Sequence, residues 1–101
     1  MTNTMINAQI VKFLNGKLTK LNPNDSIFVS IGDACGMIRI RSNDQGGLIP
    51  ACWNIMGELD HFLMELLDSD ILDIKTHLHC NQYDPEGNEF FTFFIVFEYD
   101  C

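Results

Sequence analysis

Histidine and cysteine side chains are the first candidates for chemistry in this sequence. The tetrapeptide His77-Leu78-His79-Cys80 carries two imidazoles two residues apart. On a strand both would point to one side, about 7 Å apart, a geometry that some metal sites use. His61 or a nearby carboxylate would have to supply a third ligand. The spacing is common by chance and no second pair of ligands accompanies it, so we expect surface histidines, with neither metal nor cofactor.

The parts that nucleophilic catalysis requires are not indicated by the sequence. A cysteine could meet a histidine only through the fold, and there is no G-x-S-x-G, phosphate-cradling glycine loop or H-E-x-x-H. The cysteines also lack the C-x-x-C spacing of zinc ribbons and thioredoxin-like motifs. We therefore expect that the chain is not an enzyme, and that its thiols are reduced and mostly buried. The four cysteines are Cys35, Cys52, Cys80 and Cys101.

Carboxylates are the most abundant charged groups, and they are unevenly distributed. The chain of 101 residues has a net charge of −8. Residues 1–50 carry five basic and three acidic side chains, whereas residues 51–101 carry one basic and eleven acidic ones. Such a charge balance argues against direct binding of nucleic acid. The asymmetry indicates either attraction between the two halves or a field directed at a basic partner.

Several acidic residues lie around the end of a predicted helix. Carboxylates are unfavourable there by roughly 0.3–1 kcal/mol each, because the exposed carbonyls carry partial negative charge. Such a violation often marks function, since a basic partner would relieve it. The alternative is a hydrophilic turn whose charges are solvated and partly neutralised by basic residues of the first half. The acidic candidates for partner binding are Glu58, Asp60, Glu65, Asp68, Asp70 and Asp73.

Hydrophobic periodicity predicts a single α+β domain over residues 1–101. Apolar residues at helical spacing predict helices over 4–14 and 50–68, and alternating apolar residues predict hairpins over 27–41 and 71–99. The expected order is helix, hairpin, helix, hairpin. The expected architecture is an antiparallel sheet with both helices packed on one face.

Two segments between these elements are polar. Asn15-Gly16 would end the first helix in a left-handed turn, or would form a hairpin turn with residues 17–21 returning as a strand. The polar, glycine-rich residues 42–47 predict a surface loop.

The last predicted strand is apolar on both sides. If Phe91, Phe93 and their alternate neighbours face the core with Leu72, Ile74 and Leu78, then Phe94 faces the other way. Such a strand is either covered on both sides or contributes to an interface with another chain. We therefore add Phe94 to the candidates for partner binding.

In length, acidity, α+β pattern and lack of catalytic parts, the chain resembles bacterial immunity proteins that neutralise colicin or contact-dependent growth inhibition toxins. The resemblance rests on no shared motif and identifies no binding residue. It implies a stoichiometric inhibitor that binds a basic toxin, typically a nuclease, and covers its active site.

Two other functions remain open. The first is a phage-type inhibitor of a host defence nuclease that mimics nucleic acid. The second is an intracellular adaptor whose Phe-rich strand pairs with a second copy through an exposed edge, forming a homodimer. No apolar run approaches the ~18 residues of a membrane span, and the polar start Met1-Thr2-Asn3-Thr4 lacks the layout of a signal peptide. We therefore expect a cytoplasmic protein that does not contact the membrane.

Overall fold

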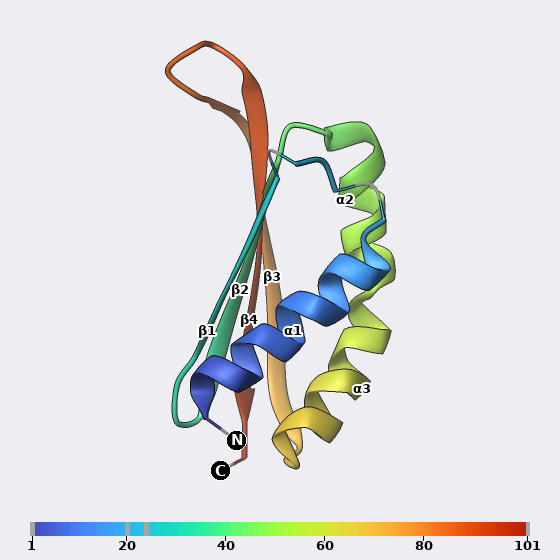
Figure 1. The fold of residues 1–101 in the computed structure, drawn as a ribbon, viewed down its shortest axis with the longest axis vertical. Helices are drawn as coiled ribbons and strands as arrows, with labels where there is room; N and C mark the ends of the chain where they lie inside the picture. Colours follow the sequence, from blue (N-terminus) through green and yellow to red (C-terminus); the bar gives the residue numbers. More distant parts are fainter. Residues whose placement is uncertain (1, 20, 24, 101) are drawn as a thin grey trace.

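The computed structural model describes residues 2–19, 21–23 and 25–100, whose helices pack against an antiparallel β-sheet (Figure 1). Along the described chain, one helix is followed by two strands, then by two helices, and then by two further strands. They are α1 (Asn3–Lys17), β1 (Ser26–Ile31), β2 (Cys35–Ser42), α2 (Gln45–Asn54), α3 (Met56–Leu67), β3 (Ile71–Tyr83) and β4 (Glu89–Tyr99).

The first helix is longer than residues 4–14. The side-chain oxygen of Thr2 accepts the backbone N–H of Met5 at 3.2 Å, which caps the N-terminus of α1. Asn15-Gly16 lies inside the helix, so it forms neither a left-handed stop nor a hairpin turn. The helix ends where the N–H of Leu18 donates to the carbonyl of Leu14 at 2.8 Å. Residues 17–19 and 21 form no strand, and Lys20 lies outside the described residues.

The predicted helix over residues 50–68 consists of two helices. Helix α2 begins at Gln45 because the Asp44 carboxylate accepts the N–H of Gly47 at 3.2 Å, so half of the predicted loop is helical. Pro50 is inside α2, where it cannot donate to the preceding turn. The buried Ile55 lies between the two helices. The apolar stripe continues across this break, which is why periodicity alone predicted one helix.

The four strands form one antiparallel sheet in the order β1-β2-β4-β3. Val29 pairs with Ile38, Ile38 with Ile95, and Phe93 with Leu78. Strand β4 therefore lies between β2 and β3, and the Phe-rich strand has no free edge with which to pair with a second copy. That form of the adaptor hypothesis is wrong.

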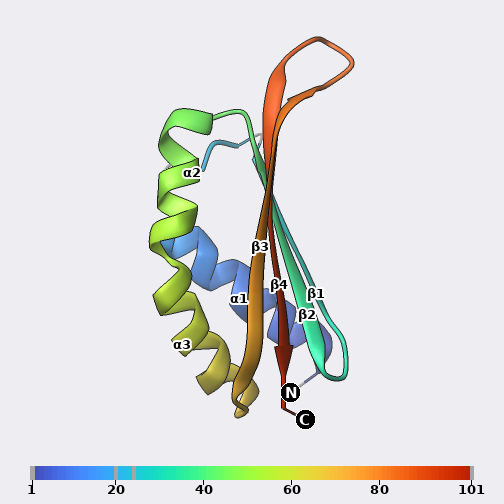
Figure 2. The same ribbon diagram turned by 180° about the vertical axis from the view of Figure 1, so that it is seen from behind.

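All three helices lie on one face of the sheet, and the other face is open (Figures 1 and 2). The hairpin of β3 and β4 extends beyond the helical layer. Gly36 allows close packing in the core, because a Cβ there would overlap the Phe97 ring and the Ile31 side chain. The buried apolar residues between helices and sheet are Ile10, Leu14, Leu18, Val29, Ile31, Ile38, Ile40, Leu48, Cys52, Ile55, Leu59, Leu63, Phe91, Phe93, Ile95 and Phe97.

Strand β3 departs from regular alternation near both ends. Its register against β4 shifts between Ile71 and Asp73 and again between His79 and Gln82. Each bulge turns side chains away from the face that simple alternation assigns to them. As a result Leu72 is 65% exposed, although alternation places it with the core.

The prediction of mostly buried thiols is wrong for two of the three described cysteines. Cys35 and Cys80 are exposed, whereas Cys52 is buried, and all three are free. Burial raises the pKa of the Cys52 thiol to about 12, so this thiol is inert at neutral pH. Among the described helices, none is long and apolar enough to cross a membrane.

Candidate protein-docking site

The corner between α3 and β3 forms a tight turn built by acidic residues. Asp68 follows the last residue of α3 in the left-handed conformation, with φ 50° and ψ 45°. Its N–H donates to the Glu65 carbonyl at 3.4 Å, and the N–H of Ser69 donates to the Met64 carbonyl at 3.3 Å. Aspartate tolerates this conformation better than most residues, although glycine is the usual choice. The turn therefore fixes a carboxylate at the negative end of the helix.

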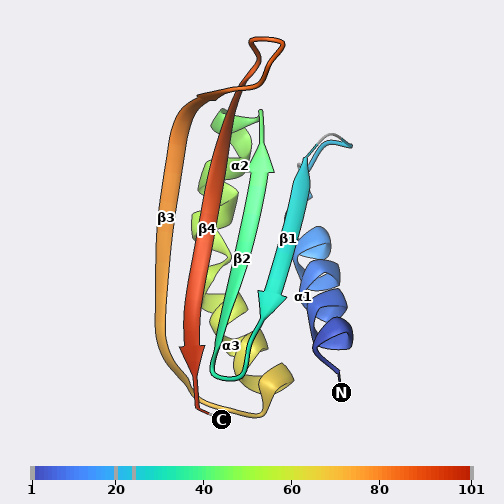
Figure 3. The same cartoon turned by 90° about the vertical axis from the view of Figure 1, so that its left-hand side faces the viewer.

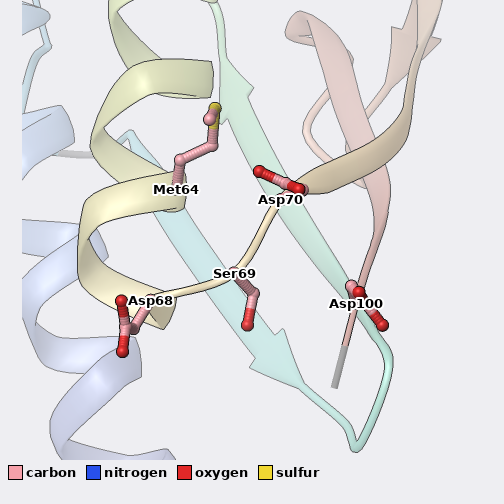
Figure 4. A pocket seen from close by; sticks show the side chains of 5 residues that line it. All are labelled: Met64, Asp68, Ser69, Asp70 and Asp100. Carbon is pink, nitrogen blue, oxygen red and sulfur yellow. The ribbon is translucent and has the colours of Figure 1, made fainter.

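The end of β4 brings another carboxylate to the same corner. The N–H of Asp100 donates to the Asp70 carbonyl at 3.0 Å. Together with Met64 and Ser69, the three aspartates line a hollow of about 450 Å³, which we call the acidic hollow (Figure 4). Figure 4 shows Asp68, Asp70 and Asp100 around it, with Met64 above Ser69.

The acidic hollow is unusually free of internal partners. Within the described chain, the side chains of Asp68, Asp70 and Asp100 make no ion pair and no hydrogen bond. The terminal carbonyls of α3 add partial negative charge to the same region. Met64 is 37% exposed and offers an apolar surface beside the carboxylates. Such a hollow suits a lysine or arginine, whose aliphatic stem packs on apolar atoms while its charge meets the carboxylates.

Sequence reasoning identified Asp68 and Asp70 but missed Asp100 and Met64. The signal for Asp100 was available, because an antiparallel hairpin returns the end of its second strand to the start of its first. Met64 could not be distinguished from the core residues of the same helix. Its exposure follows from the direction in which α3 packs.

The remaining acidic candidates lie elsewhere. The Oε2 of Glu58 is 2.8 Å from the Nζ of Lys17, so the attraction between the two halves of the chain does operate at this pair. The Oε1 of Glu65 is 3.0 Å from the Nε2 of His61, one turn earlier on α3. Asp60 is half-buried on the same helix. These three carboxylates do not line the acidic hollow.

Asp73 and Phe94 are on the open face of the sheet, which Figure 3 shows with the helices behind it. Asp73 pairs across the ladder with Glu98, and its Oδ2 is 3.5 Å from the Nζ of Lys75. Phe94 is half-buried between Arg39 on β2 and its partner on β3, His77.

His77 and His79 are exposed on this open face. The ring of His79 meets the Phe94 ring edge-on, with centroids 5.5 Å apart. No group of three or more His, Cys, Asp or Glu in the described residues is arranged to hold a metal ion. The two histidines thus have no third ligand of these types there.

A second acidic segment, the tip of the β3–β4 hairpin, uses its carboxylate for the turn. The Oδ1 of Asp84 accepts the N–H groups of Asn88 at 2.8 Å and of Glu86 at 3.0 Å. The backbone hydrogen bond from Asn88 is the main cause that lowers the pKa of Asp84. Asp84 therefore has a structural role in the turn.

No protein-family model, curated protein or solved structure matches this chain.

Proposed function

We propose that this chain is a small protein-binding inhibitor, specifically an immunity protein that neutralises a basic toxin by covering its active site with the acidic hollow. The observation that carries the proposal is the set of three carboxylates that line the acidic hollow and have no side-chain partner inside the described chain. A nuclease is the favoured target, because an enzyme that holds phosphates must present cationic side chains at its active site.

The acidic hollow would act in two steps. Its negative field would first raise the rate of encounter with a basic protein, an effect that weakens with salt. A lysine or arginine of the target would then enter the hollow and place its stem against Met64. The target's active site would lose both its cation and its access to substrate.

The local cost of the acidic residues supports this proposal. Asp68 places a charge at the wrong end of a helix dipole and occupies a left-handed position where glycine would fit without strain. Neither the charge of Asp68 nor its left-handed conformation stabilises the isolated domain. A basic partner would make the charge of Asp68 favourable, because the carboxylate would then interact with a cation.

The distribution of charge supports an inhibitor of one site rather than a mimic of a nucleic-acid duplex. Both arginines of the sequence lie on the open sheet face, and Lys17 neutralises Glu58 on the helical side. A phage-type inhibitor of a host defence nuclease could use the same hollow and would differ only in its target. We propose a cytoplasmic location, because the exposed thiols of Cys35 and Cys80 are free, as is usual in a reducing compartment.

The proposal can be tested by capture followed by an activity assay. The immobilised chain is exposed at low salt to a lysate of the cells that make it, and retained basic proteins are identified by mass spectrometry. The triple variant Asp68→Asn, Asp70→Asn, Asp100→Asn is compared with the control Glu86→Gln, Glu89→Gln, which removes charges from the hairpin tip.

We expect the wild type and the control to retain a basic protein that the triple variant loses. The nuclease activity of that protein should disappear when about one equivalent of the chain is added. Equal retention by the triple variant, or full nuclease activity in the presence of excess chain, would contradict the proposal.

A further inference from the structure

The open face of the sheet carries basic side chains that the acidic hollow does not use. The pairing register places its outward side chains in rows that cross the strands (Figure 3). One row contains Arg41 and His79, and the next contains Arg39 and His77. Lys75 lies in the third row, and within the described strands none of the three rows contains a carboxylate. This part of the surface is therefore basic in a chain whose net charge is −8.

Both arginines lie on aromatic rings and lack acceptors. The guanidinium carbon of Arg39 is 5.1 Å from the ring centre of Phe28, and that of Arg41 is 5.0 Å from the ring centre of Phe90. Within the described chain, neither guanidinium forms an ion pair or a hydrogen bond. Of the side-chain nitrogens of Arg39 only Nε is buried, so its two terminal nitrogens are accessible. A guanidinium that lies on a ring still presents parallel N–H groups at its edge, which suit a carboxylate.

The spacing of side chains along β2 defines the ligand more closely. Arg41 and Arg39 project from alternate positions of this strand, about 7 Å apart. Carboxylates at alternate positions of an extended segment have the same separation. The next outward position is the half-buried Met37, beside Val96, which is 40% exposed. An apolar side chain two residues beyond the second carboxylate would pack there.

We infer that Arg39 and Arg41 bind an acidic segment of a partner protein. The segment is extended and lies along β2, with carboxylates at two alternate positions and an apolar side chain at the third. Each carboxylate meets one guanidinium, and the apolar side chain packs on Met37 and Val96. Arginine and aromatic residues are enriched at protein interfaces, and they make up much of this surface. The site is separate from the acidic hollow and does not depend on the proposed inhibitor function.

Carboxylates bound the basic surface at both ends and limit the length of the acidic segment. On one side the next row contains Glu98 and Asp73. On the other side Asp84 and Glu86 line a hollow together with Arg41. A longer anionic chain would bring its next charges onto these carboxylates, which costs free energy. The surface therefore fits two acidic residues rather than a continuous polyanion.

The same features disfavour a nucleic acid as the partner. A nucleic-acid strand carries a phosphate at every nucleotide, so its charges would extend beyond the two arginines. Bases bind to surfaces of this kind by stacking on free aromatic faces. Here Arg39 covers a face of the Phe28 ring, and Arg41 covers a face of the Phe90 ring. A protein segment with two carboxylates is the better match.

Nuclear magnetic resonance titration of the full chain with a synthetic peptide tests this site. The acetylated and amidated peptide Ser-Glu-Ser-Glu-Ser-Leu-Ser has its carboxylates at alternate positions. We expect a dissociation constant below about 1 mM, with shifted backbone amide signals between Met37 and Arg41. The peptide Ser-Glu-Glu-Ser-Ser-Leu-Ser has the same composition but places its carboxylates on opposite sides of an extended segment. It should bind at least about fivefold more weakly.

Substitution of either arginine should weaken binding of the first peptide at least about fivefold. Arg41→Gln removes a charge, whereas Arg39→Lys keeps the charge but loses the paired N–H groups. The matched control Lys12→Gln removes an exposed charge from α1 and should change the dissociation constant less than about twofold. The amide spectrum of each variant establishes that it is folded.

A dissociation constant above about 1 mM for the first peptide would overturn the inference. So would equal binding of the second peptide, or undiminished binding by either arginine variant. An oligonucleotide of about ten thymidines serves as a further probe. If the wild type binds this strand more tightly than the first peptide, and Arg41→Gln abolishes that binding, the face belongs to a nucleic acid and the protein segment is ruled out.

Discussion

The acidic hollow and the hairpin tip carry similar sets of carboxylates, but they use them differently. The tip holds Asp84 with Glu86 and Glu89, and the Asp84 carboxylate closes the turn by accepting backbone N–H groups. The hollow gathers three aspartates whose side chains have no such partner within the described chain. The number of acidic residues in a segment is therefore a poor guide to its role. What distinguishes the two regions is whether the fold itself uses the carboxylate oxygens.

The largest expected difference between these regions is kinetic. Neutralising Asp68, Asp70 and Asp100 to asparagine should lower the association rate constant with the captured basic protein about tenfold or more at low salt, because steering depends on the local field. Neutralising Glu86 and Glu89 to glutamine should change it less than about twofold. Stopped-flow mixing measures both rate constants. Comparable losses in the two variants would mean that only net charge matters and that the hollow has no special role.

A smaller effect is expected on stability at the hollow. Asp68→Asn retains a residue that tolerates the left-handed conformation and removes the charge from the end of α3. We expect the free energy of unfolding to rise by about 0.3–1 kcal/mol. Urea unfolding followed by the fluorescence of Trp53, the single tryptophan, measures this change. A lower stability would show that Asp68 serves the fold after all.

The smallest effect is expected at the tip and depends on pH. Because folding lowers the pKa of Asp84 from its ordinary value of 3.8, its ionised form stabilises the folded state above that pH. This contribution is lost as the pH falls through the lowered pKa of the folded state. The wild type should therefore have a higher urea midpoint than Asp84→Asn at pH 7, and the difference should vanish well below pH 3.8. A difference that is independent of pH would rule out the charged hydrogen bonds as its cause.

The sequence predicted the parts of the fold that depend on local periodicity. The alternation of Phe91, Phe93, Ile95 and Phe97 with outward residues is confirmed, because one side of β4 is buried under the helices. The exposure of Leu72 could not be foreseen, since the bulge that turns it outward exists only in the pairing of β3 with β4. The break between α2 and α3 at Ile55 could not be foreseen either, because the apolar residues keep their helical spacing across it.

The candidate site likewise combines residues that the sequence identifies with residues that only the fold brings together. Asp68 and Asp70 were recognised because they violate a rule of helix electrostatics that is visible in the sequence. Asp100 is 30 residues from Asp70 and joins it only through the hairpin. The ion pair of Lys17 with Glu58 could not be predicted from the acidic residues of the second half, because it forms between α1 and α3. Local rules therefore located part of the hollow, and tertiary contacts decided which carboxylates complete it.

The most direct test of docking at the acidic hollow is hydrogen–deuterium exchange of the chain with and without the captured basic protein. If the acidic hollow is the docking site, binding slows exchange in the turn from Asp68 to Asp70 and at Asp100, while the hairpin tip from Asp84 to Asn88 is unchanged. Protection confined to the hairpin tip or to the outer surface of α1, with none at the acidic hollow, would contradict docking at the hollow.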